Sequence, residues 1–137
     1  MNNKILFLVD HKHRDLPGLS LIGFFLINIG YKIFYRRVWD TKHLYFDPSV
    51  IIIPKANNGS KEFINRCNKW RKSGIKLIVI ETEGNEQWLI GEKIMNTVPD
   101  MFFFWNKIEE KKHETFLKIN RGGRFIVTSR DIRLRLR

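Results

Sequence analysis

The sequence has few of the residues that build disulfides or metal centres. Cys67 is the single cysteine among 137 residues, which excludes an internal disulfide and a thiolate metal cluster. The histidines do not compensate for this shortage, because His43 and His113 are not spaced for metal ligation with His11 and His13. We therefore expect no metal site and a reducing compartment such as the cytoplasm.

Long apolar runs are also absent. Only five apolar residues separate Lys4 from Asp10, too few for the apolar region of a signal peptide. The stretch LSLIGFFLINIG (Leu19 to Gly30) is too short to span a bilayer and predicts a buried helix instead. A soluble, cytoplasmic protein is the expectation.

Acidic residues are scarce relative to basic ones. The chain has 25 lysines and arginines against 14 aspartates and glutamates, a formal net charge of +11. Much of the excess lies in the C-terminal stretch RGGRFIVTSRDIRLRLR. Such a charge fits a nucleic acid, an anionic membrane face or a phosphorylated sugar, and charge alone does not choose among them.

Apolar residues make up 43% of the chain, and they fall into strand-length runs separated by helical stretches. The predicted strands are Lys4–Asp10, Tyr31–Trp39, Val50–Pro54, Ile75–Ile80, Met101–Trp105 and Arg124–Thr128. The predicted helices are Leu19–Ile29, Ser60–Lys72, 85–97 and 106–120. This alternation predicts the α/β class, as a Rossmann-like three-layer α/β/α sandwich around a mostly parallel sheet of five to six strands.

Ligands of such sheets bind outside the carboxyl ends of the strands, so the loops that follow the strands are the candidate sites. The predicted loops are His11–Gly18, Trp39–His43, Lys55–Gly59 and Glu81–Glu86. The first lacks both GxGxxG and GxxxxGK[ST], which leaves dinucleotide binding without support and excludes a P-loop NTPase.

The first loop, within VDHKHRDLPG (Val9 to Gly18), places two histidines, a lysine and an arginine between Asp10 and Asp15. Cationic side chains beside the positive end of a helix suit an anionic ligand such as a phosphate or a carboxylate. The alternative is a solvated loop in which Arg14 pairs locally with Asp15 and Asp10 caps a turn.

The fourth loop reads ETEG, from Glu81 to Gly84. Glu81 and Glu83 are two residues apart in an extended segment and point to the same side, which can raise the pKa of one of them. A carboxylate placed in this way could act as a general base. The alternative is that one of them caps the helix expected to begin near Asn85.

The pieces KILFLVDHKHRDLPGLSLIGFFLINIGYKIFY, FDPSVIIIPKAN and GIKLIVIETEG together resemble the N-terminal half of bacterial surface carbohydrate biosynthesis proteins. These look like glycosyltransferases of the GT-B fold, active in capsule, lipopolysaccharide and other polysaccharide synthesis. The matched motifs are spread over roughly Lys4 to Trp105. By this resemblance, residues 1–120 form a Rossmann-like acceptor-side domain. Residues 121–137 form a basic strand and tail where the crossover to a second domain is expected, as in a truncated or split protein.

The resemblance also implies roles for the loop residues. Glu81 or Glu83 would be catalytic, deprotonating an acceptor hydroxyl. The residues implied in substrate binding are Asp10, His11, Arg14, Asp15 and Gly84. The acceptor would be a glycan or a lipid-linked sugar, reached by peripheral contact with the anionic inner membrane. No cofactor is expected in this chain, because a nucleotide-sugar donor would bind the missing domain or a partner chain that supplies it; activity of the chain alone is therefore doubtful.

Two other functions remain open. The net charge and the RLRLR ending suit a nucleic-acid-binding module, although no helix-turn-helix, zinc or RRM signature is present. A receiver-like regulatory domain would need an aspartate after the third strand, where Pro54-Lys55 stands instead.

Overall fold

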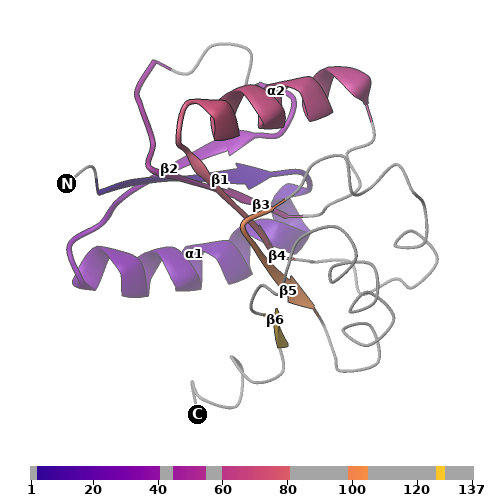
Figure 1. Ribbon diagram of the computed structural model, residues 1–137. Coiled ribbons are helices and arrows are strands. Elements are labelled where there is room, and N and C mark those ends of the chain that lie inside the picture. Colours follow the sequence, from indigo (N-terminus) through magenta and orange to yellow (C-terminus); the bar gives the residue numbers. More distant parts are fainter. Residues whose placement is uncertain (1–2, 41–44, 55–59, 81–98, 105–125, 129–137) are drawn as a thin grey trace.

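The computed structural model describes residues 3–40, 45–54, 60–80, 99–104 and 126–128 (Figure 1). Strands and helices follow one another in the order β1 (Lys4–Val9), α1 (Lys12–Asn28), β2 (Lys32–Arg37), β3 (Val50–Ile53), α2 (Lys61–Lys72), β4 (Lys76–Ile80), β5 (Met101–Phe104) and β6 (Ile126–Thr128). The helices expected at 85–97 and 106–120 and the domain boundary expected at 120/121 lie outside the described residues.

The strands pair in parallel in the order β2-β1-β3-β4-β5-β6. The register aligns Ile5 with Ile33 of β2 on one side and with Val50 of β3 on the other. The chain therefore adds β2 on one side of β1 and then crosses to add β3 on the other. The predicted α/β class with a parallel sheet is confirmed.

The two helices that the described residues contain pack on opposite faces of this sheet (Figure 1). Successive residues of a strand point to opposite faces. Leu6 and Leu8 accordingly join the core under α2, whereas Ile5, Phe7 and Val9 join the core under α1. Burial on both faces explains why β1 is an unbroken apolar run rather than an alternating one.

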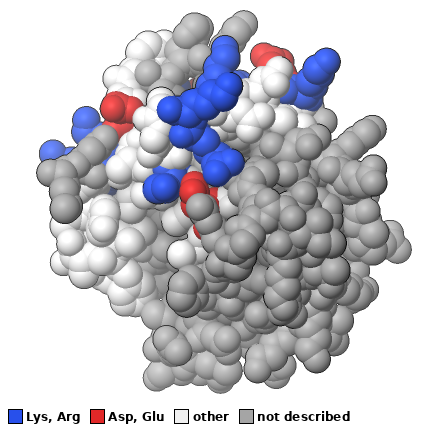
Figure 2. Space-filling model, viewed as in Figure 1, with Lys and Arg blue, Asp and Glu red and all other residues white. Residues whose placement is uncertain are grey.

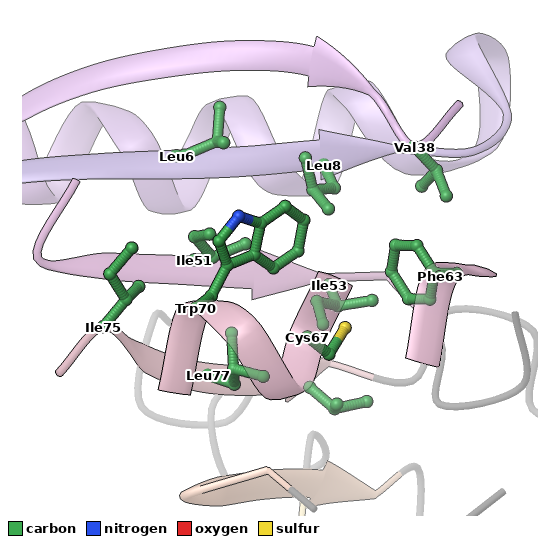
Figure 3. Packing of buried hydrophobic residues seen from close by; sticks show 11 residues of the cluster. Leu6, Leu8, Val38, Ile51, Ile53, Phe63, Cys67, Trp70, Ile75 and Leu77 are labelled. Carbon is green, nitrogen blue, oxygen red and sulfur yellow. The ribbon is translucent and has the colours of Figure 1, made fainter. Parts of the chain in front are cut away.

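The helix α2 follows the sequence prediction closely. The Ser60 side chain caps it by accepting a hydrogen bond from the Phe63 N–H at 3.1 Å, and Gly74, with φ of +87°, follows its end. Phe63, Cys67 and Trp70 point from one side of α2 into the core (Figure 3). Cys67 is fully buried in this cluster, which confirms it as a core residue. Burial also raises the pKa of its thiol from 9.0 to about 12, which disfavours a nucleophilic thiolate.

The helix α1 begins much earlier than the sequence predicts. The expected loop from His11 to Gly18 is wrong, because the helix already starts at Lys12 and encloses Pro17. Proline favours a helix start, but here the Asp15 carboxylate accepts hydrogen bonds from the N–H groups of Asp10 and His11 and holds the first turn ahead of Pro17. The connection between β1 and α1 is thus reduced to two residues, Asp10 and His11.

The inner side of α1 lies against the sheet through Leu19 and Gly23. Gly23 allows a close approach of Tyr35 of β2, whose hydroxyl donates a hydrogen bond to the Leu19 carbonyl at 3.4 Å. The Tyr35 ring also stacks on Phe7 with ring centroids 5.3 Å apart. In the part of the chain that the structure describes, no helix has both the length and the apolar character needed to cross a membrane.

Candidate functional site

The strand order places a switch point between β1 and β3. The chain leaves β1 through α1 toward β2 on one side, and leaves β3 through α2 toward β4 on the other. In open parallel sheets, ligands bind outside the carboxyl ends of the strands at such a switch point. Asp10 and His11 follow β1 at this edge, and Pro54 follows β3.

The turn after β1 is held by a buried carboxylate. Asp15 is 1% exposed, and its Oδ2 accepts hydrogen bonds from the backbone N–H groups of Asp10 at 3.0 Å and His11 at 2.8 Å. The Asp15 N–H in turn donates to the His11 carbonyl at 2.9 Å. The carboxylate thus fixes the exit of β1, and the Asp15 N–H makes the first helical hydrogen bond of α1, so one residue holds both elements at the turn.

The Arg14 guanidinium neutralises the acidic side of the same turn. Its Nε lies 2.6 Å from Asp15 Oδ1, and its Nη2 lies 3.3 Å from Asp10 Oδ2. The local pairing of Arg14 with Asp15 that the sequence allowed is therefore confirmed. The Asp10 carboxylate also pairs with Arg14, and its capping of a turn stays a prediction. Direct contact of Asp10, Arg14 or Asp15 with a substrate stays a prediction.

The side chains left facing solvent at this turn are cationic or titratable. His11, Lys12 and His13 are exposed, and the His11 and His13 ring centroids are 6.1 Å apart. His11 is the N-cap residue of α1, yet its side chain makes no capping hydrogen bond. The imidazoles and the Lys12 ammonium thus flank the positive end of a 17-residue helix, a combination that favours an anionic group.

The described residues contain no cluster of three or more potential metal ligands among histidine, cysteine, aspartate and glutamate. Glu81, Glu83 and Gly84 lie outside the described residues. In sequence they directly follow Ile80, the last residue of β4, and β4 pairs with β3. Their predicted catalytic and binding roles stay predictions.

The sequence reasoning gave no role to Trp39, which the structure leaves 62% exposed. The preceding residue, Val38, is buried and donates its N–H to the Val9 carbonyl at 3.0 Å. That bond brings the end of β2 to the end of β1, so Trp39 follows at the same edge as Asp10. The sequence signal for an exposed side chain here was a tryptophan next to a charged residue at the end of a predicted strand. Asp40, the next residue, lies on the surface with its Oδ2 3.6 Å from Arg36 Nη1.

At the opposite edge, Asp100 holds the amino ends of the strands together. Its Oδ2 accepts a hydrogen bond from the Leu77 N–H at 2.9 Å, and its carboxylate lies within 4 Å of the side chains of Arg71 and Lys76. This carboxylate therefore ties the residue before β5 to the start of β4, away from the carboxyl edge.

No family model, curated protein or solved structure matches this chain.

Proposed function

We propose that this chain is the acceptor-side domain of a glycosyltransferase-like protein of bacterial surface polysaccharide biosynthesis. In this proposal the sheet and its helices form a Rossmann-like three-layer sandwich, one half of a GT-B fold. The observation that carries the proposal is the position of the β1–α1 turn: a cation-bearing helix start, fixed by the buried Asp15, stands at the switch point of the sheet. A fold alone does not define an activity, so the proposal depends on this site.

Each part of the turn has a separate task in this proposal. His11, Lys12 and His13 bind a phosphate or an acidic sugar of the acceptor through charge and hydrogen bonds. Asp15 also acts as a positioning residue, because its buried carboxylate holds the turn that carries His11. Glu81 or Glu83, after the neighbouring β4, deprotonates the acceptor hydroxyl. The nucleotide-sugar donor is supplied by a donor-binding domain, and the reaction takes place at the cytoplasmic face of the inner membrane.

The proposal is tested by ¹⁵N NMR on the full chain, with glucose 1-phosphate as a probe and inorganic phosphate as a control. We expect the sugar phosphate to shift the amide signals of Asp10 to His13 and to bind more tightly than phosphate alone. The His11→Ala substitution should weaken its binding at least fivefold, about 1 kcal/mol. The matched control is Lys69→Ala on the outer side of α2, which should leave binding unchanged. Equal affinity for phosphate, or shifts centred on α2, would refute the proposed site.

A second candidate function is nucleic-acid binding, favoured by the charge on α2. Lys61, Lys69 and Lys72 are exposed on this helix, which carries a single acidic residue, Glu62. Figure 2 shows the blue side chains gathered toward the top, over α2. Fluorescence anisotropy with a labelled single-stranded RNA distinguishes the two functions. A phosphate-binding face predicts affinity that falls steeply between 50 and 200 mM salt, on the order of tenfold for three contacts, and that is lost when the three lysines become glutamine. Binding that ignores both changes would exclude α2 as the interface.

A further inference from the structure

The outer side of α1 is apolar where a solvent-facing helix is normally polar. Leu21, Phe24 and Phe25 are 49%, 59% and 46% exposed, on the side opposite to the packed Leu19 and Gly23. The rings of Phe24 and Phe25 meet edge to face, with centroids 5.7 Å apart. A helix that is apolar on all sides needs an apolar environment on its outer side as well. We call Leu21, Phe24 and Phe25 the outer patch.

The charges around the outer patch follow a simple pattern. No charged residue occurs from Leu16 to Tyr31, and the single acidic residue of α1, Asp15, is buried. Exposed cations stand at both ends instead, Lys12 before the patch and Lys32 after it. In Figure 2 the lower left, where α1 lies in Figure 1, is a white expanse without blue or red.

From this pattern we propose that the outer patch docks α1 on an anionic lipid surface, with the helix axis parallel to the membrane. Leu21, Phe24 and Phe25 enter the boundary between headgroups and acyl chains, while Lys12 and Lys32 meet lipid phosphates. Tyr31, 37% exposed, lies beside the C-terminal end of α1 and adds an interfacial aromatic residue. The absence of exposed acidic groups on α1 matters here, because they would be repelled by an anionic surface.

Charge and size favour a lipid surface over a second copy of the chain. Two copies would each bring a net charge of +11, which opposes self-association and favours an anionic surface. A helix of this length is about 25 Å long and about 10 Å wide. The outer side of α1 thus offers about 250 Å², well below the roughly 800 Å² per partner that a stable dimer buries.

The docking surface deepens the proposed function, which places the reaction at the inner membrane, but the residues that carry it are independent of the sugar-phosphate site. The two are tested on different residues, the outer patch of α1 and the turn at His11. Binding to vesicles without binding of sugar phosphate would support the docking surface and refute the proposed sugar-phosphate site. Binding of sugar phosphate without binding to vesicles would support that site and refute the docking surface.

The test is co-sedimentation of the full chain with vesicles of phosphatidylethanolamine and phosphatidylglycerol (7:3), compared with pure phosphatidylcholine. We expect binding to the anionic vesicles at least tenfold stronger than to the neutral ones. The double substitution Phe24→Gln/Phe25→Gln should lower the partition coefficient at least tenfold. It should keep the helical circular dichroism signal, because both side chains already face solvent. The matched control is Lys69→Gln/Lys72→Gln, which removes two charges from the opposite helix and should change binding less than threefold.

Three results would overturn the proposal. The first is absence of binding to anionic vesicles, and the second is binding that the glutamine pair leaves unchanged, which would place the contact elsewhere. The third comes from size-exclusion chromatography: a dimer that the glutamine pair dissociates would assign the outer patch to a second copy. If the glutamine pair fails to fold, Phe24→Gln alone, with an expected loss of at least threefold, replaces it.

Discussion

Replacing Gly23 with alanine tests the closest approach between α1 and the sheet. An added Cβ would overlap the Tyr35 hydroxyl oxygen, whereas the next nearest atoms, Ile33 Cγ2 at 3.4 Å and Tyr35 Cζ at 3.5 Å, would be in ordinary contact. The overlap is thus confined to one oxygen atom. Tyr35 is 39% exposed, so its ring can swing outward, but only by leaving Phe7 and the Leu19 carbonyl.

The magnitude follows from what that movement breaks. Loss of the ring stack on Phe7 costs about 1 kcal/mol, and loss of the hydroxyl hydrogen bond costs about 1 kcal/mol more. Alanine returns about 1 kcal/mol through its higher helix propensity. Gly23→Ala should therefore lower the free energy of unfolding by about 1 kcal/mol in the natural chain. In a Tyr35→Phe background the overlapping oxygen is gone, and the same change should raise it by about 1 kcal/mol.

Urea unfolding of the four chains, followed by circular dichroism, measures both effects and their coupling of about 2 kcal/mol. Gly18→Ala is the control, because nothing lies within 4 Å of its added Cβ and it should be stabilising in both backgrounds. Equal effects of Gly23→Ala with and without the hydroxyl would refute the assigned contact.

Three further predictions concern the turn, the cap of α2 and the buried thiol. Asp15→Ala should lower the free energy of unfolding, measured in urea, by about 3 kcal/mol, since two backbone donors lose a charged acceptor. Asp10→Ala loses a partly exposed ion pair and should lower it by less than about 1 kcal/mol. Equal losses would contradict the role of the Asp15 carboxylate in holding the turn. Ser60→Ala should cost about 1 kcal/mol in the same assay and Ser60→Asp much less, and a neutral alanine variant would mean that the cap contributes nothing. With its pKa raised to about 12, the Cys67 thiol should resist a disulfide reagent at pH 8 in the folded chain and react fully in urea. Because the unfolded thiol ionises first, the free energy of unfolding should fall by about 1.4 kcal/mol per pH unit between pH 9 and pH 12, relative to Cys67→Ala. Rapid labelling of the thiol in the folded chain would contradict its burial.

The sequence was most informative where one local signal acts alone. The two ends of α2 were predictable from Ser60 and Gly74, because a serine cap and a glycine stop are local signals. The strand at Lys4 to Val9 was predictable because an unbroken apolar run requires burial on both faces. Around Pro17 two signals compete. The proline indicates a helix start, but the Asp15 carboxylate accepts hydrogen bonds from the N–H groups of Asp10 and His11. The helix begins at Lys12, five residues before Pro17.

The position of the candidate site was predictable from the sequence, but which of its residues are structural and which face solvent was not. Parallel strands must end at one edge, so the region after Val9 could be selected without a structure. Asp15 and His11 are both polar residues of the same short stretch, and composition does not separate them. Burial does: Asp15 is enclosed by backbone donors, while His11 faces solvent.

The position of β2 at the edge of the sheet has a consequence for how the protein behaves at high concentration. A free edge strand can recruit the edge of another molecule and start an aggregate. β2 carries Lys32, Arg36 and Arg37, and an antiparallel pair of β2 strands centred between Phe34 and Tyr35 would set Lys32 of each copy opposite Arg37 of the other. Like charges in facing positions oppose such pairing, and added salt screens them. The chain should therefore stay monodisperse longest in dilute buffer, and concentrated salt should promote its assembly through this edge.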